Sequence, residues 1–86
     1  MNYFGKYRGR ILSNEDESKT GQLLVLVPDV LGEVQRWAMP CVPYSELSGA
    51  VPAIPPLGGN VWVEFEAGNP SFPIWSGLFW ARGEAP

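Results

Sequence analysis

The sequence contains no histidine and only one cysteine, and these two shortages exclude much of the chemistry that small enzymes use. Without imidazole there is no Ser-His-Asp or Cys-His arrangement, and mixed Cys/His zinc sites are excluded as well. A single cysteine forms neither an internal disulfide nor a four-cysteine metal cluster. We interpret Cys41 as a small buried apolar side chain, because a nucleophilic thiol needs an activating base and the usual one is absent.

Charged residues are also few. Six Lys and Arg against nine Asp and Glu give a net charge of −3, and charged residues make up 17% of the chain, which is below the usual quarter. An acidic chain has the wrong sign for a protein that holds nucleic acid through its phosphates. We therefore expect no nucleic-acid partner.

No long apolar run is present. The longest aliphatic run, Leu23 to Val27, is far shorter than the ~20 residues that cross a membrane, and residues 1–10 are polar and basic, unlike a signal peptide. We expect no stable membrane partner, and 86 residues allow one small domain. The chain does contain four Trp. Few charges and many aromatic residues are typical of a domain that buries surface against other chains.

The apolar residues recur with a period of two, which indicates β-strands with one buried face. Residues 60–66 show this most clearly, with one face formed by Val61, Val63 and Phe65. The opposite face carries Trp62, a candidate contact anchor. The other strands are predicted at residues 6–11, 22–27, 37–42 and 72–80, and residues 22–27 are apolar on both faces, as in a strand covered on both sides. Five strands without a helix predict an all-β fold, a small closed barrel of the OB or SH3-like kind.

Two carboxylates are candidates for chemistry. Glu64 and Glu66 share a strand face with Trp62, and their Cα atoms would lie about 6.6–6.8 Å apart, a spacing compatible with glycoside hydrolysis. Catalytic carboxylates usually come from different elements and lie in a cleft, so a solvated or interface face is the favoured interpretation. A small hydrolase or sugar-binding domain remains an alternative. We expect no enzyme activity, no catalytic residue, no metal and no cofactor.

Two charged segments have a plain structural interpretation. Residues 14–17 are polar and acidic but lack the spacing of a calcium loop, which favours a solvated turn, with Gly21 available for a positive φ. Lys6, Arg8 and Arg10 form a basic stripe on one strand face. Such a stripe could follow a nucleic-acid backbone, which keeps an OB-fold oligonucleotide-binding module as the alternative function. Pairing with carboxylates or with an acidic partner is favoured.

Ordered motifs along the chain resemble a known family. They are Phe4-Gly5-Lys6-Tyr7-Arg8-Gly9, Gly21 to Pro28, Trp37 to Tyr44, Pro55 to Gly58, Val61 to Pro70 and Pro73-Ile74-Trp75-Ser76-Gly77. The set spans about residues 4–80. It resembles the OB-fold domain in the central spike proteins of contractile injection machines, a group that includes the phage baseplate hub lysozyme, phage baseplate assembly protein V and the VgrG protein of type VI secretion. The resemblance implies a five-stranded antiparallel OB-fold barrel over residues 1–82, with residues 83–86 as a tail.

In that family the OB domain is structural, and three copies form a ring between a tubular hub and a three-fold needle. The resemblance therefore implies an assembly protein at the hub–spike junction, a homotrimer that contacts the tail hub protein and the spike or tip protein. It implies a place in the virion, at the phage tail baseplate, or in another assembled injection particle, after synthesis in the bacterial cytoplasm. The expected partner interface comprises Leu47, Val51, Ile54, Trp62, Phe79 and Trp80.

The sequence departs from the family pattern in two loop positions and in length. Relatives often have an Asp-Pro step where residues 14–17 lie, and a basic residue where this chain has Gln22. No β-helix repeat follows residue 82 and a lysozyme-like domain does not fit, so the lytic activity known in the family is not inferred. The needle is then a separate chain, or this chain is one domain of a longer protein.

Overall fold

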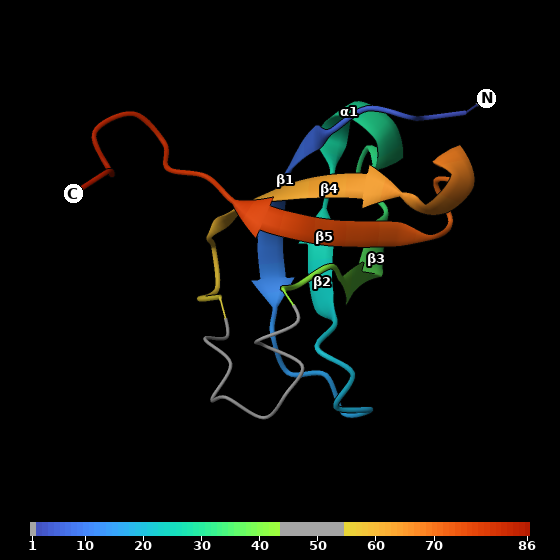
Figure 1. The fold of residues 1–86 in the computed structure, drawn as a ribbon, viewed down its shortest axis with the longest axis horizontal. Coiled ribbons are helices and arrows are strands. Elements are labelled where there is room, and N and C mark those ends of the chain that lie inside the picture. Colours follow the sequence, from blue (N-terminus) through green and yellow to red (C-terminus); the bar gives the residue numbers. More distant parts are fainter. Residues whose placement is uncertain (1, 44–54) are drawn as a thin grey trace.

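Five strands close into a barrel in the computed structural model, which describes residues 2–43 and 55–86 (Figure 1). The elements are β1 (Tyr7–Ser13), β2 (Leu23–Leu26), the helix α1 (Pro28–Leu31), β3 (Gln35–Pro40), β4 (Asn60–Phe65), the 3-10 turn η1 (Glu66–Gly68) and β5 (Pro73–Leu78). Around the barrel the strands follow the order β1-β2-β3-β5-β4. The prediction of a small all-β barrel of OB type is confirmed. The short helix α1 differs from the prediction of five strands without a helix. No helix of the described part is long and apolar enough to cross a membrane.

One strand pair corrects the prediction of a purely antiparallel barrel. β3 and β5 run parallel, with Met39 opposite Ile74 and Pro40 opposite Trp75, whereas the other four pairs are antiparallel. The reason is parity. In a closed ring each antiparallel neighbour reverses the direction, and an odd number of reversals does not return to the starting direction. A closed barrel of five strands therefore contains at least one parallel pair.

The barrel interior is filled by one face of each strand, as the period of two predicts. The buried apolar residues are Ile11, Leu23, Val25, Val27, Ala38, Val61, Val63 and Phe65. On β4 the outer face carries Trp62 and Glu64, both half-buried, which confirms the predicted alternation. The expectation that β2 is covered on both sides is only partly right. Leu24 and Leu26 are half-buried, because they point away from the interior.

β1 contains a glycine where the barrel wall is tightest. Gly9 is buried, and a Cβ added there would lie 3.0 Å from Val63 Cγ2 and 3.1 Å from the carbonyl oxygen of Leu26. We expect Gly9→Ala to lower the free energy of unfolding by about 1–3 kcal/mol, because overpacking displaces core side chains and backbone. Gly5→Ala is the control, since its Cβ would meet Tyr7 at an ordinary 3.6 Å. Thermal denaturation compares the two, and equal melting temperatures would contradict the expectation.

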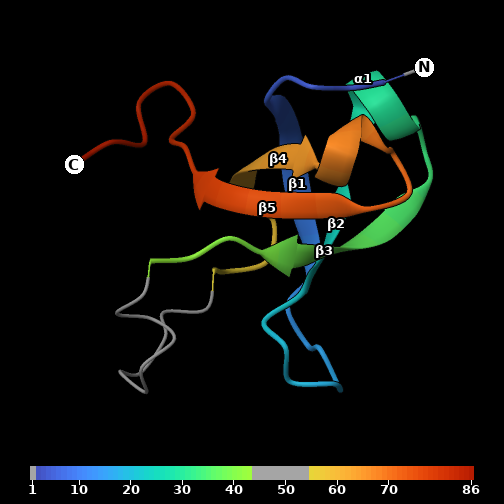
Figure 2. The ribbon, with the colours of Figure 1, turned by 45° about the vertical axis from the view of Figure 1, so that its right-hand side comes forward.

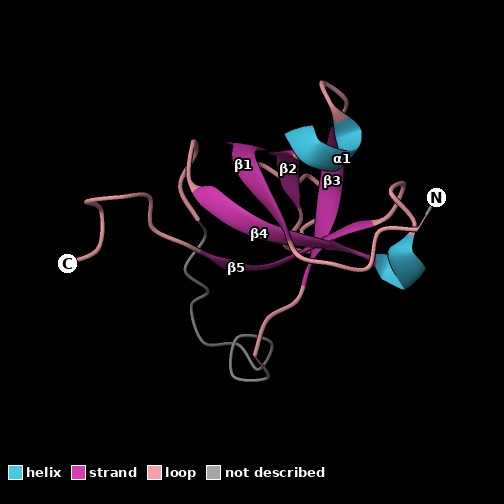
Figure 3. Cartoon of the chain, turned by 90° about the horizontal axis from the view of Figure 1, so that it is seen from above, coloured by secondary structure: helices cyan, strands magenta, loops and turns pink. Residues whose placement is uncertain are grey.

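The two ends of the barrel carry different connections. α1, η1 and the N-terminal segment lie at one end, and the loop between β1 and β2 projects from the other (Figure 2). Seen from above, α1 lies at the end of the barrel, where it connects the neighbouring strands β2 and β3 (Figure 3). The N-terminal segment is tied to η1 by the backbone N–H of Tyr3, which donates to the carbonyl oxygen of Gly68 at 2.8 Å. The projecting loop and the outer wall of the barrel therefore present separate surfaces.

Candidate partner interface

The residues expected at the partner interface are only partly covered by the structure. Leu47, Val51 and Ile54 lie outside the described residues. Trp62 is on the outer face of β4, and Phe79 directly follows β5. The two rings pack together, with their centroids 4.6 Å apart. The structure thus brings together two residues that lie far apart in the sequence.

An arginine completes this arrangement. Arg8 of β1 lies opposite Trp62 in the register of β1 and β4. Its guanidinium carbon is 5.5 Å from the centre of the Trp62 ring and 4.9 Å from that of Phe79. Both distances suit a cation–π interaction. We call Arg8, Trp62 and Phe79 the outer aromatic cluster; its arginine comes from the basic stripe, and the pairing of β1 with β4 is what brings it there.

A β-bulge aims Phe79 at Trp62. β5 holds an extra residue opposite the step from Trp62 to Val63, so that Gly77 pairs with Trp62 while Trp75 pairs with Val63. Gly77 has a φ of +148°, a conformation that favours glycine. The shift corrects the alternation expected for residues 72–80: Trp75 packs against the core, whereas Phe79 turns outward.

Large apolar side chains remain exposed where β5 ends. Leu78 is 50% exposed and Trp80 is 65% exposed. Trp37 and Met39 on the outer face of β3 are also exposed. Single exposed apolar residues are common on soluble proteins, but grouped ones mark contact sites. Within the described residues, the expected interface therefore exposes its apolar side chains mainly at the end of β5, beside the outer aromatic cluster.

The two candidate catalytic carboxylates do not form a site. Glu66 lies in η1 beyond the end of β4 and is exposed. Nζ of Lys6 lies 3.1 Å from Oε1 of Glu64 and forms an ion pair with it. The hydrogen bond from Lys6, and to a smaller extent one from Ser76, holds the pKa of Glu64 below its ordinary value. A carboxylate kept ionised is poorly suited to donate a proton to a leaving group. The prediction that the basic stripe pairs with a carboxylate is confirmed for Lys6.

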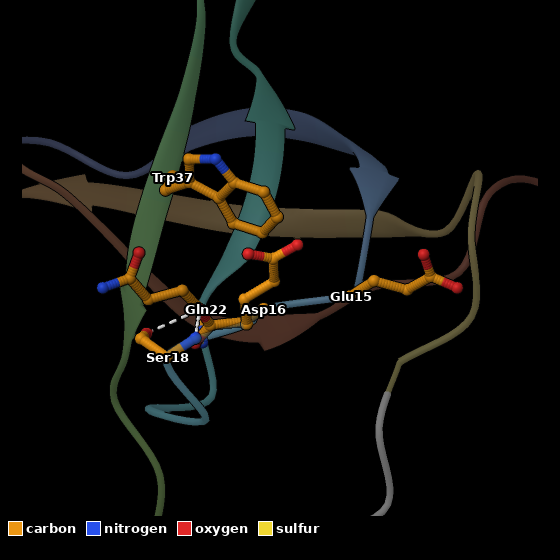
Figure 4. Close-up of a pocket in the computed structure, with 6 residues that line it drawn as sticks. Glu15, Asp16, Ser18, Gln22 and Trp37 are labelled. Atoms are coloured by element: carbon orange, nitrogen blue, oxygen red, sulfur yellow. Dashed lines mark hydrogen bonds between the residues drawn. The ribbon is translucent and has the colours of Figure 1, made fainter.

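The acidic turn between β1 and β2 is built around one carboxylate (Figure 4). Oδ1 of Asp16 accepts hydrogen bonds from the backbone N–H and hydroxyl of Ser18, at 3.0 and 2.6 Å. Oδ2 accepts from the N–H and hydroxyl of Thr20, both at 2.9 Å, and from the N–H of Gln22 at 3.1 Å. Gly21 has a φ of +80°, as predicted. Asp16 therefore organises the loop. Separately, no cluster of three or more potential metal-ligating side chains occurs in residues 2–43 and 55–86.

Removing the charge of Asp16 should loosen this loop. The Ser18 hydroxyl, with help from Gln22 and Thr20, holds the pKa of Asp16 well below 3.8. Because the folded-state pKa is lowered, the loop keeps these bonds above about pH 4 and loses them only as the pH falls through the lower value. We expect constant Thr20 and Gln22 amide proton shifts from pH 7 to pH 4, and severalfold faster amide exchange in Asp16→Asn. Glu17→Gln is the control; equal exchange rates in both variants would refute the role of Asp16.

Cys41 is exposed, which corrects the expectation of a buried thiol. β3 ends at Pro40, so Cys41 lies beyond the part of the strand that faces the core. Its backbone is still attached to the barrel, because its N–H donates to the carbonyl oxygen of Trp75 at 2.9 Å. The predicted strand extended to residue 42, and this two-residue difference misplaced the side chain.

Comparison with known protein families agrees with the OB-type barrel. The family model described as the type VI secretion system/phage-baseplate injector OB domain matches residues 7–80, which include all five strands. No curated protein matches the chain. The family is a structural baseplate family, and the match covers most of the chain. This protein belongs to the family of OB domains found in type VI secretion and phage-baseplate injectors.

Proposed function

We propose that this protein is a structural subunit at the hub–spike junction of a contractile phage tail or a related injection machine. It assembles as a homotrimer and adapts the tail tube to a three-fold spike in the finished particle. The observation that carries the proposal is the family match over residues 7–80. The exposed aromatic and apolar residues at the end of β5 support it, because a subunit that works by shape needs surfaces for its neighbours.

The proposal assigns two surfaces. Phe79 and Trp80 lie where the chain leaves the barrel, and we assign them to the contact with the spike. Leu47, Val51 and Ile54 are assigned, on the resemblance alone, to a neighbouring subunit or to the hub. The proposed subunit has no catalytic step, and its contribution is to present these surfaces on a rigid barrel.

An oligonucleotide-binding module has less support. Bases bind such modules by stacking on open aromatic faces beside a basic groove. Here Trp62 and Phe79 already pack on each other and on Arg8. The exposed Trp37 of β3 lines a depression together with Glu15 and Asp16 of the loop between β1 and β2 (Figure 4). Phosphates would be repelled by these carboxylates. Titration with single-stranded DNA at low salt tests this alternative, for which we expect no binding.

Mass measurement in solution and electron microscopy of the native particle test the proposed function together. Sedimentation equilibrium at increasing concentration should give three times the mass of the chain, and the particle should contain a ring of barrels between tube and spike. A chain that stays monomeric at high concentration and is absent from purified particles would refute the proposal.

A further inference from the structure

The described surface carries two patches of opposite charge, each beside aromatic side chains. The first, which we call the basic patch, comprises the outer aromatic cluster and Arg10, two residues further along the same face of β1. The second, the acidic loop, comprises Glu15 and Glu17 of the loop between β1 and β2. Glu15 and Glu17, together with Trp37, line the depression drawn in Figure 4.

Neither patch forms an ion pair within the described residues, and the nearest negative charge to Arg10 in the register is Glu84, whose carboxylate accepts from the side chain of Asn60 opposite Arg10. The ion pair in that part of the chain joins Lys6 to Glu64, which takes Lys6 out of the basic stripe. Arg8 is held by aromatic rings rather than by a carboxylate, and Arg10 is exposed. The wall of the barrel therefore keeps two positive charges on a protein whose net charge is −3.

The acidic loop is held in shape by its own hydrogen bonds before any contact forms. The carboxylate of Asp16 is used by the loop itself, through five hydrogen bonds from Ser18, Thr20 and Gln22. The flanking Glu15 and Glu17 are exposed, and Lys19 offsets part of their charge. A loop that is already ordered loses less conformational entropy when it binds. Arg8 is likewise fixed in place by Trp62 and Phe79.

The position of the two patches determines which contact they make. The loop projects beyond one end of the barrel (Figures 1 and 2). The basic patch lies on the outer wall, because Arg8 and Trp62 face each other on the outer faces of β1 and β4. One copy thus presents two different, complementary surfaces. Such a pair gives a head-to-tail contact, and repetition of that contact closes a ring when the rotation permits.

We propose that the acidic loop of one copy docks on the basic patch of a second copy of this chain. The contact sets Glu15 and Glu17 against Arg10, with Arg8 and Trp62 beside them, while Phe79 stays with Trp80 in the proposed contact with the spike. This inference rests on the proposed homotrimer and specifies which surfaces form it. Oppositely charged patches also fix the register of the contact and exclude the reversed arrangement, which would bring like charges together.

Charge reversal tests the inference. Arg10→Glu should weaken self-association about tenfold at low salt, and Glu15→Arg and Glu17→Arg should do the same. Combining Arg10→Glu with at least one of the two acidic reversals should restore association to near the original level, because the pair is re-formed with opposite polarity. Sedimentation equilibrium gives the association constants, and melting temperatures report whether each variant is folded.

Two control variants carry the same changes in charge elsewhere. Arg82→Glu and Glu33→Arg lie in exposed positions outside both patches and should leave association unchanged. A trimer that forms but is insensitive to all three reversals, or a double variant without recovery, overturns the inference and leaves the proposed function standing. A monomer at every concentration overturns the inference, and a monomer that is also absent from purified particles overturns the proposed function as well. Binding of single-stranded DNA that Arg10→Glu abolishes would assign the basic patch to nucleic acid and overturn the inference.

Discussion

Replacing Phe65 with alanine is expected to lower the free energy of unfolding by about 3–5 kcal/mol. Phe65 ends β4 and is 6% exposed. Its ring lies 5.7 Å from that of Tyr7 and 6.2 Å from that of Tyr3, so three aromatic rings pack together at this end of the barrel. The backbone bond from Tyr3 to Gly68 holds the covering segment in place. The neighbouring side chains therefore cannot fully fill the cavity that Phe65→Ala would leave, and the van der Waals contacts of the lost ring are not replaced.

This loss is large for so small a domain. Domains of this size are typically stable by only about 5–15 kcal/mol, and a melting temperature about 12 °C lower or more is expected. Phe72→Ala is the matched control: it removes the same side chain from a position that is 57% exposed. Differential scanning calorimetry compares the two variants. If Phe65→Ala melts as the Phe72→Ala variant does, then the packing at this end does not stabilise the barrel as described.

Replacing Trp80 with alanine is expected to weaken assembly by about thirtyfold or more while leaving the folded chain intact. A large aromatic residue at the centre of an interface commonly contributes 2 kcal/mol or more, which corresponds to that factor. Trp80 is 65% exposed and follows β5. Its removal therefore costs the isolated barrel little, and its effect should be seen in the contact that we propose with the spike.

Incorporation into particles provides the measurement for Trp80. Tails assembled with the Trp80→Ala chain should lack it or bind it weakly, whereas its melting temperature should stay close to that of the original chain. Val34→Ala is the control. Val34 is a 51% exposed aliphatic residue between α1 and β3, away from the end of β5 that Trp80 follows. Normal incorporation of the Trp80→Ala chain would remove Trp80 from the interface.

The strands could be predicted because alternation follows from chain geometry alone. In residues 60–66 the apolar side chains point inward and Trp62 points outward, and both faces were assigned from the sequence. The parallel pair of β3 and β5 was not predicted. A closed ring of five strands requires at least one parallel pair, but no local pattern shows which two strands form it. The bulge at Gly77 was missed for a similar reason, since its extra residue is visible only against the partner strand.

Two residues of the outer aromatic cluster, Trp62 and Phe79, were named from the sequence, and whether they contact a partner stays a prediction. Their contact with Arg8 depends on the pairing of β1 with β4. The role of Asp16 inside its loop was also missed, although Ser18 and Thr20, two and four residues further on, are a signal of side-chain bonding within a turn. Contacts between residues close in sequence can be predicted from such spacings. Contacts between residues on different strands can be predicted only when the strand pairing and its register are known.

The order of the strands around the barrel also determines where the barrel tolerates a change in length. β4 lies on the far side of β5 from β3, so β3 and β4 are not neighbours and no two-residue hairpin turn joins them. The turn from β4 to β5 has little slack, because Glu66, Asn69 and Phe72 donate or accept in successive backbone bonds. The barrel itself therefore tolerates added length between β3 and β4 better than between β4 and β5, because there it changes the closure entropy only slowly. An affinity tag placed there would still compete with the contact proposed for Leu47, Val51 and Ile54.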